Sequence, residues 1–258
     1  MRQNNYRLIE KRELDDTGKL WQLQFEAPGI NARPGQFVNI LVDGCYLRRP
    51  ISVSEYDGEV LTLIIDTVGE GTKRIVETEP GESLDMLTGL GNSFSLSLKE
   101  KGQVILIGGG VGYAPLVGLF KCLREIPGLT PLAFFGFNNL STMPQVHLNE
   151  LRREYGEEIQ IATMTGEYGF KGNALELAMS YIAEKGITTK FFYTCGPMPM
   201  MKAVCNAFDF DGQASLESRM GCGFGACMGC SIPTPSGPKR ICKEGPVFRK
   251  SELGNFDF

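Results

Sequence analysis

Four cysteines near the C-terminal end constrain this chain more than any other feature. Cys222, Cys227 and Cys230 are separated by four and two residues, and Cys242 follows later. The residues between and beside them include four glycines, Gly221, Gly223, Gly225 and Gly229. Glycine permits turns with φ > 0 and close backbone approach, so such a loop can wrap tightly around a metal centre and direct backbone N–H groups at its sulfur ligands.

This spacing is the one found for the ligands of plant-type [2Fe–2S] clusters. A structural zinc site is an alternative, but zinc usually takes two C-x2-C pairs, and here only Cys227 and Cys230 form one. Disulfides would suit a secreted protein, whereas Met1–Tyr6 lacks the apolar segment of a leader peptide. We therefore predict a cytoplasmic protein whose iron–sulfur cluster is bound by Cys222, Cys227, Cys230 and Cys242.

Composition excludes several classes of function. The net charge of −4 comes without a cluster of lysine and arginine, so neither nucleic acid nor an anionic membrane is an expected partner. No apolar run has the length of a membrane span. The single histidine, His147, excludes catalysis by paired imidazoles, and we expect it on the surface of a polar helix. The other four cysteines are expected to be buried thiols: Cys45, Cys122, Cys195 and Cys205.

The first hundred residues have the pattern of short strands. Apolar and polar residues alternate, and turn sequences such as Ala27–Gly29 and Asp57–Gly58 separate the runs. Regularly spaced short strands of this kind indicate a small antiparallel β-barrel. The expected strands are Leu20–Glu26, Gln36–Val42, Ile51–Val53 and Val60–Ile65.

From about Gln103 the pattern changes to apolar strands that alternate with helices. This alternation is typical of a doubly wound parallel sheet, a nucleotide-binding architecture. The expected elements are Val104–Gly108, a helix over Ala114–Arg124, Pro131–Gly136, a helix near Val146–Tyr155, Ile159–Thr163, a helix near Ala174–Glu184, Phe191–Cys195 and a helix near Met198–Ala207. We expect three domains: 1–100, 101–212 and, around the cysteines, 213–258.

Two motifs of the barrel region are suited to phosphate. Arg48 and Arg49 precede Pro50, and a planar guanidinium held by a strand matches a pyrophosphate. Further along, Gly69-Glu-Gly71-Thr72 predicts a glycine turn that opens a short helix, whose free N–H groups can bind a second phosphate. Each motif alone also fits an ordinary surface or turn, but their order on one barrel favours a nucleotide site.

A third motif joins a buried strand to a helix, at Ile107–Pro115. Its glycines include Gly109, Gly110 and Gly112, which predict a dinucleotide site although the sequence is not the standard fingerprint. No basic residue follows the next strand to bind a 2′-phosphate, which favours NAD(H) over NADP(H). Cys195 ends a later strand at the ligand-binding edge, so it lies either against a nicotinamide or flavin ring or simply in the core.

Taken together, these motifs resemble the ferredoxin reductase superfamily. The residues that carry the resemblance are Arg49–Ser52, Gly71-Thr72, Gly89–Asn92, the glycines 108–110, Cys195–Pro197 and the cysteine loop. Within the superfamily, the loop and the ending Arg240–Phe248 are similar to the electron-transfer subunits of NAD-dependent (type 1B) dihydroorotate dehydrogenase.

The resemblance implies one FAD on the barrel, NAD(H) on the α/β domain and a [2Fe–2S] cluster in the C-terminal loop. By matching position, FAD would be bound by Arg49, Pro50, Ile51, Ser52, Ile64, Ile65, Asp66, Gly71 and Thr72. Asp66 departs from the family, which often has arginine there. Because a carboxylate repels a flavin phosphate, we expect Asp66 to contribute through its backbone. Phe224 and Met228 are expected to limit water access and to face a partner.

The resemblance also implies a partner, an FMN-containing catalytic subunit that oxidises dihydroorotate to orotate in pyrimidine biosynthesis, with two copies of each subunit in a heterotetramer. Electrons would pass from FMN through the cluster and FAD to NAD+. Two alternatives remain open from the sequence. One is a related flavin and iron–sulfur subunit of another complex, such as a sulfide dehydrogenase, ferredoxin–NADP reductase or hydrogenase. The other is a non-enzymatic zinc-binding module.

Overall fold

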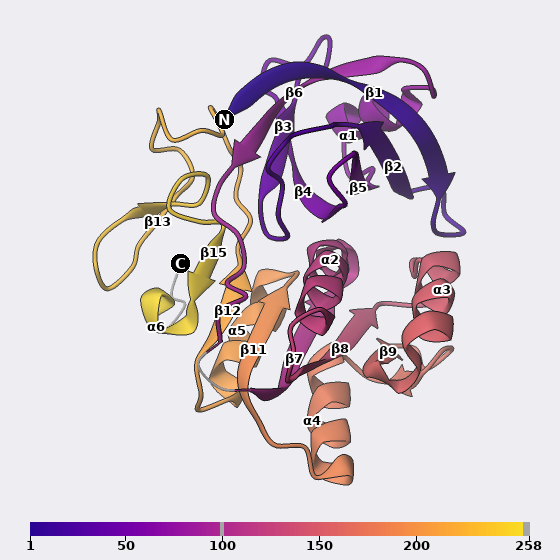
Figure 1. Cartoon of the computed structure of the whole chain (residues 1–258), viewed down its shortest axis with the longest axis vertical. Helices are drawn as coiled ribbons and strands as arrows, with labels where there is room; N and C mark the ends of the chain where they lie inside the picture. Colours follow the sequence, from indigo (N-terminus) through magenta and orange to yellow (C-terminus); the bar gives the residue numbers. More distant parts are fainter. Residues whose placement is uncertain (99–100, 255–258) are drawn as a thin grey trace.

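The computed structural model describes residues 1–98 and 101–254. Its N-terminal part is a closed, antiparallel barrel of six strands in the order β1-β2-β5-β4-β3-β6 (Figure 1). The strands are β1 (Arg2–Glu13), β2 (Leu20–Glu26), β3 (Phe37–Ile40), β4 (Arg49–Tyr56), β5 (Val60–Asp66) and β6 (Ser83–Leu90), and a short helix, α1 (Glu70–Glu77), links the last two. The barrel expected from the sequence is confirmed.

Two barrel strands have no counterpart in the sequence prediction. β1 is mostly polar, and among its residues only Tyr6 and Leu8 are buried. β6 has no regular alternation of buried and exposed residues. These two strands pair with each other and thereby close the barrel. Closure depends on partners that are distant in sequence, so the local pattern of either strand is weak.

The second part is a seven-stranded sheet in the order β10-β9-β8-β7-β11-β12-β15. The five strands β9, β8, β7, β11 and β12 run parallel with β10, and the last strand, β15, is antiparallel. The elements are β7 (Gly102–Gly109), α2 (Tyr113–Arg124), β8 (Leu129–Phe137), α3 (Gln145–Tyr155), β9 (Ile159–Thr163), β10 (Phe170–Lys171), α4 (Ala174–Lys185), β11 (Thr189–Cys195), α5 (Met198–Ala207), β12 (Gly212–Ser215) and β15 (Val247–Arg249).

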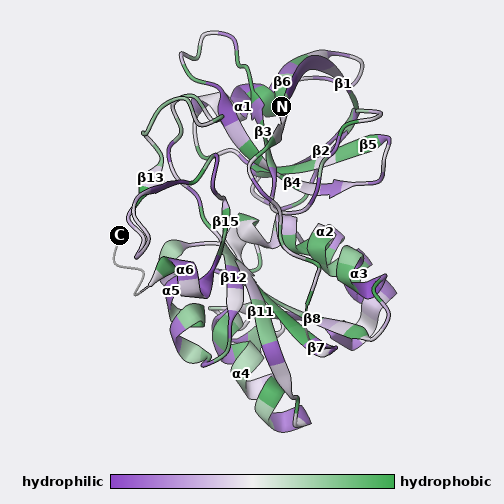
Figure 2. Ribbon diagram, turned by 60° about the vertical axis from the view of Figure 1, so that its left-hand side comes forward, coloured by the Kyte–Doolittle hydropathy of each residue, from purple (hydrophilic) through white to green (hydrophobic). Residues whose placement is uncertain are grey.

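This sheet is covered on both faces, as a doubly wound fold requires. Val104 and Leu106 of β7 pack with residues of α2 and α3, whereas Ile105 and Ile107 pack with residues of α4 and α5. The middle residues of the central strands, such as Val104–Ile107 of β7, are therefore apolar, whereas polar residues such as Gln103 and Thr130 lie toward the strand ends. Figure 2 shows the apolar colour in the middle of the sheet. The helices and parallel strands expected from the sequence are confirmed, with bounds that differ by a few residues at most.

The C-terminal segment is tied to the α/β sheet. It contains β13 (Ser231–Ile232), β14 (Lys239–Arg240), β15 and α6 (Lys250–Leu253), and β15 pairs with β12. Cys230 and Cys242 pack in the same apolar cluster as Ile105 and Phe192 of the sheet. The sheet thus runs across the domain boundary predicted at 212–213. The boundary predicted at 100–101 lies partly outside the described residues, as does the predicted end at 258.

Helix α2 joins the barrel to the sheet. Gly118 lies so close to β4 that a Cβ atom there would be 1.9 Å from the carbonyl oxygen of Ser54. The buried hydroxyl of Ser54 also donates to the carbonyl oxygen of Ala114 at 3.0 Å. The barrel and the nucleotide-binding edge of the sheet are therefore held in close contact through α2. Within the described part of the chain, no helix combines the length and apolar character needed to cross a membrane.

Candidate functional site

Residues of the barrel, the sheet and the C-terminal segment meet around one cavity of about 250 Å³. Of the residues predicted to bind FAD, six line it through the barrel: Pro50, Ile51, Ser52, Ile64, Ile65 and Asp66. Thr72 of α1 lines it as well, and Gly112 closes it from the sheet. The sequence prediction missed the wall that the C-terminal segment supplies, which consists of Leu216, Glu217, Ser218, Met220 and Pro246.

Arg49 and the start of α1 form a basic cradle beside this cavity. A Cβ atom at Gly71 would lie 2.2 Å from the Nε atom of Arg49, so glycine at this position lets the guanidinium lie against the first turn of the helix. The N–H group of Gly69 donates to the hydroxyl of Thr72 at 3.2 Å, and that hydroxyl donates back to the carbonyl oxygen of Gly69 at 3.0 Å. A guanidinium beside a helix N-terminus is suited to a phosphate group.

The two neighbouring arginines have different roles. Arg48 forms an ion pair with Asp85 at 2.5 Å and donates to the carbonyl oxygen of Asn39, so it joins barrel strands to each other. Arg49 donates only to the nearby carbonyl oxygen of Leu47 among the described partners. Of the pair considered for pyrophosphate binding, Arg49 is therefore the one available to a ligand.

Asp66 lies where two cavities meet. It lines the 250 Å³ cavity and also a larger one of about 740 Å³ over the edge of the sheet. Burial raises the pKa of the Asp66 carboxyl, the charge of Asp15 raises it further, and Lys19 partly opposes this. Partial burial and a second carboxylate make this corner less favourable for a phosphate.

The larger cavity lies where ligands bind in open α/β sheets. Gly109 and Gly110 line it, and so do Gly136 and Phe137 at the end of β8. The sequence prediction missed its opposite wall, which comes from the barrel. That wall includes Asp15, Thr17, Lys19 and Lys73. Basic side chains therefore do reach this cavity, from the barrel and not from the segment after β8 that the sequence argument considered.

Gly112 packs directly against the backbone of Cys195 at the end of β11. A Cβ atom at Gly112 would lie 2.5 Å from the Cα atom of Gly196 and 2.6 Å from the carbonyl oxygen of Cys195, so the turn can approach β11 only with glycine. The Cys195 side chain is 2% exposed, and burial, with the charge of Glu217 added, raises its pKa far above the usual range. Cys195 lines neither of these two cavities, so its thiol is a neutral neighbour of the site.

The four C-terminal cysteines are arranged as two pairs. The Sγ atoms of Cys222 and Cys227 are 3.4 Å apart, and the N–H group of Cys242 donates to the Sγ atom of Cys230 at 3.4 Å. Burial raises the pKa of Cys242, and the Cys230 and Cys222 thiols raise it further, so the two pairs lie within electrostatic reach of each other. Within residues 1–98 and 101–254, no three His, Cys, Asp or Glu side chains form the ligand set of one metal ion.

The loop around these sulfurs has the properties that a two-iron cluster needs. Partial burial disfavours the Cys222 thiolate, but N–H groups of Cys227, Phe224 and Ala226 outweigh this and lower its pKa. Gly223 and Gly225 adopt φ values of 75° and 88°, as the loop composition suggested. Two pairs of cysteine sulfurs, with backbone donors aimed at sulfur, fit two iron atoms with two protein ligands each better than one zinc ion with four.

Two other predictions have different outcomes. His147 does not lie on the helix surface as expected: it is 7% exposed, and its Nδ1 atom is 3.0 Å from the hydroxyl of Tyr113. Helix α3 directs this side chain toward α2. The polar residues next to His147 in the sequence gave no sign of this packing.

Phe224 and Met228 are 45% and 58% exposed, so both remain available to a partner.

Comparison with known proteins identifies the family. Residues 217–254 match the model of the iron–sulfur cluster binding domain of dihydroorotate dehydrogenase B. The dihydroorotate dehydrogenase B (NAD(+)) electron transfer subunit of Fusobacterium nucleatum is 38% identical over 228 residues, which cover 85% of this chain and 86% of the relative. The chain belongs to this family. The subunit of the same name from Bacillus caldolyticus is 34% identical and covers 96% of this chain and 95% of its own.

Solved structures agree on the fold. A structure of an NADH-dependent reduced ferredoxin–NADP oxidoreductase aligns with a TM-score of 0.83 at 23% identity, over 96% of this chain and 89% of that one. Phthalate dioxygenase reductase aligns with a TM-score of 0.63 at 16% identity, over 79% of this chain and 63% of its own. The ferredoxin reductase fold expected for this family member is thereby confirmed.

Proposed function

We propose that this chain is the electron-transfer subunit of an NAD-dependent dihydroorotate dehydrogenase and delivers electrons from a catalytic partner to NAD+. One observation carries the proposal: the barrel, the glycine turn of the sheet and the cysteine-bearing segment all line one cavity. A group bound there would have the 740 Å³ cavity over the sheet edge, called the nucleotide cavity below, on one side and the paired cysteines on the other. Membership of the family supplies the class of partner.

The groups that these sites fit are FAD, NAD(H) and a [2Fe–2S] cluster. A nicotinamide exchanges electrons as a pair, a cluster exchanges them singly, and a flavin does both. In this proposal the chain contributes Arg49, Gly71 and Thr72 to the flavin phosphates. The apolar side chains of Pro50, Ile51, Ile64 and Ile65, with Ser52 beside them, would exclude water from the flavin.

The remaining predicted residues divide between the other two groups. Gly109 and Gly110 allow the nucleotide to approach the end of β7 closely. Gly112, also predicted for NAD(H), lines the flavin cavity, and Cys195 supports its turn from behind. Cys222 and Cys227 would hold one iron atom, and Cys230 and Cys242 would hold the other, because the fold brings each pair of sulfurs together. The buried pair lies toward the sheet, and the half-buried pair lies toward solvent.

The proposed partner is an FMN-containing subunit that oxidises dihydroorotate to orotate, and two copies of each subunit form a heterotetramer. The exposed Phe224 and Met228 flank Cys227 in the loop, so they are suited to an apolar contact with that partner next to the cluster. The bound cluster would accept electrons from that partner, and NAD+ would be their final acceptor, in pyrimidine biosynthesis. The proposed location is the cytoplasm, where thiolate ligands stay reduced.

Co-expression with the catalytic subunit, followed by anaerobic purification, tests this function. We expect a complex that contains FAD, two iron atoms per copy of this chain, and dihydroorotate-dependent reduction of NAD+. Stoichiometric zinc without flavin would support the zinc-binding module instead. A coloured protein that forms no complex and reduces NAD+ only with other donors would assign the chain to another partner.

A further inference from the structure

Strand β3 lies between two parts of the proposed site. One is the 250 Å³ cavity proposed for FAD, called the flavin cavity below, and the other is the loop from Cys222 to Cys230, called the cysteine loop. Its residues alternate in direction: Val38 and Ile40 belong to the barrel core, whereas Phe37 packs with the sheet and lines the flavin cavity. Asn39 shares the face of Phe37, because residues two apart in a strand point the same way. In the paired strand, Phe37 lies opposite Ser52 and Asn39 lies opposite Pro50, and both partners line the same cavity.

The Asn39 side chain reaches the cysteine loop directly. Its Nδ2 atom donates to the carbonyl oxygen of Cys222 at 3.3 Å, across 183 positions of sequence. The next residue of the loop is Gly223, where a Cβ atom would lie 2.3 Å from the same Nδ2 atom. The loop backbone therefore lies against the Asn39 amide, and the glycine at position 223 leaves room for this contact.

Asn39 is buried and incompletely satisfied. It is 1% exposed, and its Oδ1 atom has no hydrogen-bond partner among the described residues. A buried amide with one unpaired acceptor destabilises a protein by an amount comparable to a lost hydrogen bond. A leucine of similar size would avoid this cost in a barrel that needed only packing at this position. The amide is thus better explained by its contact with the loop than by the stability of the barrel.

The backbone of Asn39 is held from behind. Arg48 donates to the carbonyl oxygen of Asn39 at 3.2 Å and to that of Asp85 at 3.3 Å, while pairing with the Asp85 carboxylate. This arrangement ties β3 to β6 at the point where the Asn39 side chain leaves the barrel. Asn39 therefore projects from a rigid part of the strand.

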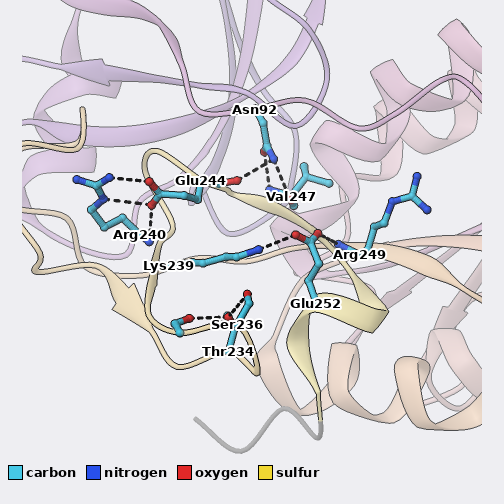
Figure 3. Close-up of polar contacts among 10 residues, drawn as sticks. Asn92, Thr234, Ser236, Lys239, Arg240, Glu244, Val247, Arg249 and Glu252 are labelled. Carbon is cyan, nitrogen blue, oxygen red and sulfur yellow. Dashed lines mark hydrogen bonds and ion pairs between the residues drawn. The ribbon is translucent and has the colours of Figure 1, made fainter.

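Other polar contacts hold the C-terminal segment, but at greater distance along the chain from the first cysteine. Asn92 donates to the carbonyl oxygens of Glu244 and Val247, and accepts from the Val247 N–H group at 2.9 Å (Figure 3). Arg240 donates to the carbonyl oxygen of Gly225 at 2.6 Å and pairs with Glu244. These contacts secure the segment and the far side of the loop, whereas Asn39 contacts a predicted ligand residue itself.

We propose that Asn39 is a positioning residue for electron transfer between the flavin and the cluster: its amide couples the cysteine loop at Cys222 to the strand that forms the flavin cavity. This role rests on the proposed function. One strand thereby sets both ends of the transfer, because Phe37 and Asn39 are one pleat repeat apart, about 7 Å along β3. Electron transfer falls steeply with distance, so a loop released from this contact transfers electrons more slowly even when both groups are bound.

The test compares Asn39→Leu with wild type in the cofactor-loaded full chain. We expect Asn39→Leu to keep FAD and NADH-dependent reduction of an artificial dye, and to slow NADH-dependent reduction of the cluster about tenfold, as loss of an outer contact to a metal ligand typically does. The electron paramagnetic resonance spectrum of the reduced cluster should change, because the Cys222 backbone is no longer held. Thr88→Val is the matched control, since it removes another buried hydrogen bond of the barrel, the 3.2 Å contact between Thr88 and Tyr6.

A second variant keeps the test decisive if leucine impairs folding. Asn39→Asp preserves shape but cannot donate to the carbonyl oxygen of Cys222, and its charge should shift the cluster potential to a more negative value. Cluster reduction at the wild-type rate with an unchanged spectrum in both variants would overturn the proposal. So would equal losses of dye reduction and cluster reduction, or the same spectral change in Thr88→Val. A wild-type chain without iron or flavin would instead contradict the proposed function.

Discussion

Different interactions stabilise the α/β sheet and the cysteine-bearing segment, although the two regions share a sheet edge and an apolar cluster. The sheet is covered by helices on both faces, and the middle residues of its central strands are apolar. The loop from Cys222 to Cys230 has no regular secondary structure, and side chains hold its backbone through Asn39 and Arg240. Apolar packing distributes stability over many contacts, whereas the loop depends on a few directed bonds and on its metal. Single substitutions should therefore affect the two regions differently.

The largest expected effect is on the loop. Cys227→Ser should abolish cluster binding and dihydroorotate-dependent NAD+ reduction, while NADH-dependent dye reduction remains, because the flavin and nucleotide cavities do not include Cys227. Iron content and the two activities measure this. Cys122→Ser, at a half-buried cysteine of α2, is the matched control and should keep both activities. Parallel loss of dye reduction would show that the two regions are not separable.

A smaller effect, on the free energy of unfolding, is expected in the sheet, where close packing leaves no space for an added methyl group. Gly112→Ala places a Cβ atom against the backbone of Cys195 and Gly196 and should lower the free energy of unfolding by about 3 kcal/mol. Gly186→Ala, in open space at φ 61° and ψ 36°, should cost about 1 kcal/mol. Chemical denaturation compares the two. Equal losses would mean that the turn after β7 adapts more easily than close packing allows.

The third prediction concerns pH and the contact between α2 and α3. Burial lowers the pKa of His147 from 6.5 to about 4, and the charges of Lys121 and Arg12 contribute. Between these values the unfolded chain binds the proton more readily than the folded chain, so stability is full above pH 6.5 and is lost as the pH falls toward 4. The loss between pH 7 and 4.5 should be about 2 kcal/mol. His147→Phe should flatten this part of the profile, and an unchanged slope would assign it to other groups.

The smallest effect is expected at the barrel cradle. Arg49→Ala should weaken FAD retention about tenfold, because one charge-assisted contact to phosphate is lost. Flavin released on dilution measures it. Arg7→Ala, at an exposed arginine paired with Glu26 on the barrel surface, should retain FAD as wild type does. Unchanged flavin content in Arg49→Ala would remove this residue from the site.

The sequence and the structure agree best where the pattern is local. β2, β9 and α5 begin and end where alternation, apolar runs and helix periodicity placed them. The cysteine spacing likewise predicted a loop with glycines at φ > 0, since the spacing between ligands within a tight turn is a property of the turn itself. Such features need no knowledge of distant residues.

Other features depended on contacts between distant parts of the chain. β1 and β6 were not expected, because their pairing closes the barrel and only closure gives them a buried side. His147 became a core residue when α3 packed on α2, and the barrel supplied one wall of the nucleotide cavity through Asp15 and Lys19. None of these contacts can be predicted from the periodicity of the sequence near the residues concerned.

The amino-acid sequence by itself determined the classes of site in this protein, because glycine turns, arginine beside proline and spaced cysteines act over a few residues. Tertiary structure alone decided how those sites are joined. Pro50 and Ser52 line a cavity with Gly112 and Met220, and Asn39 meets Cys222 from the far end of the chain. Contacts between residues so far apart in the chain depend on how whole strands and helices pack, and the local sequence pattern does not predict them.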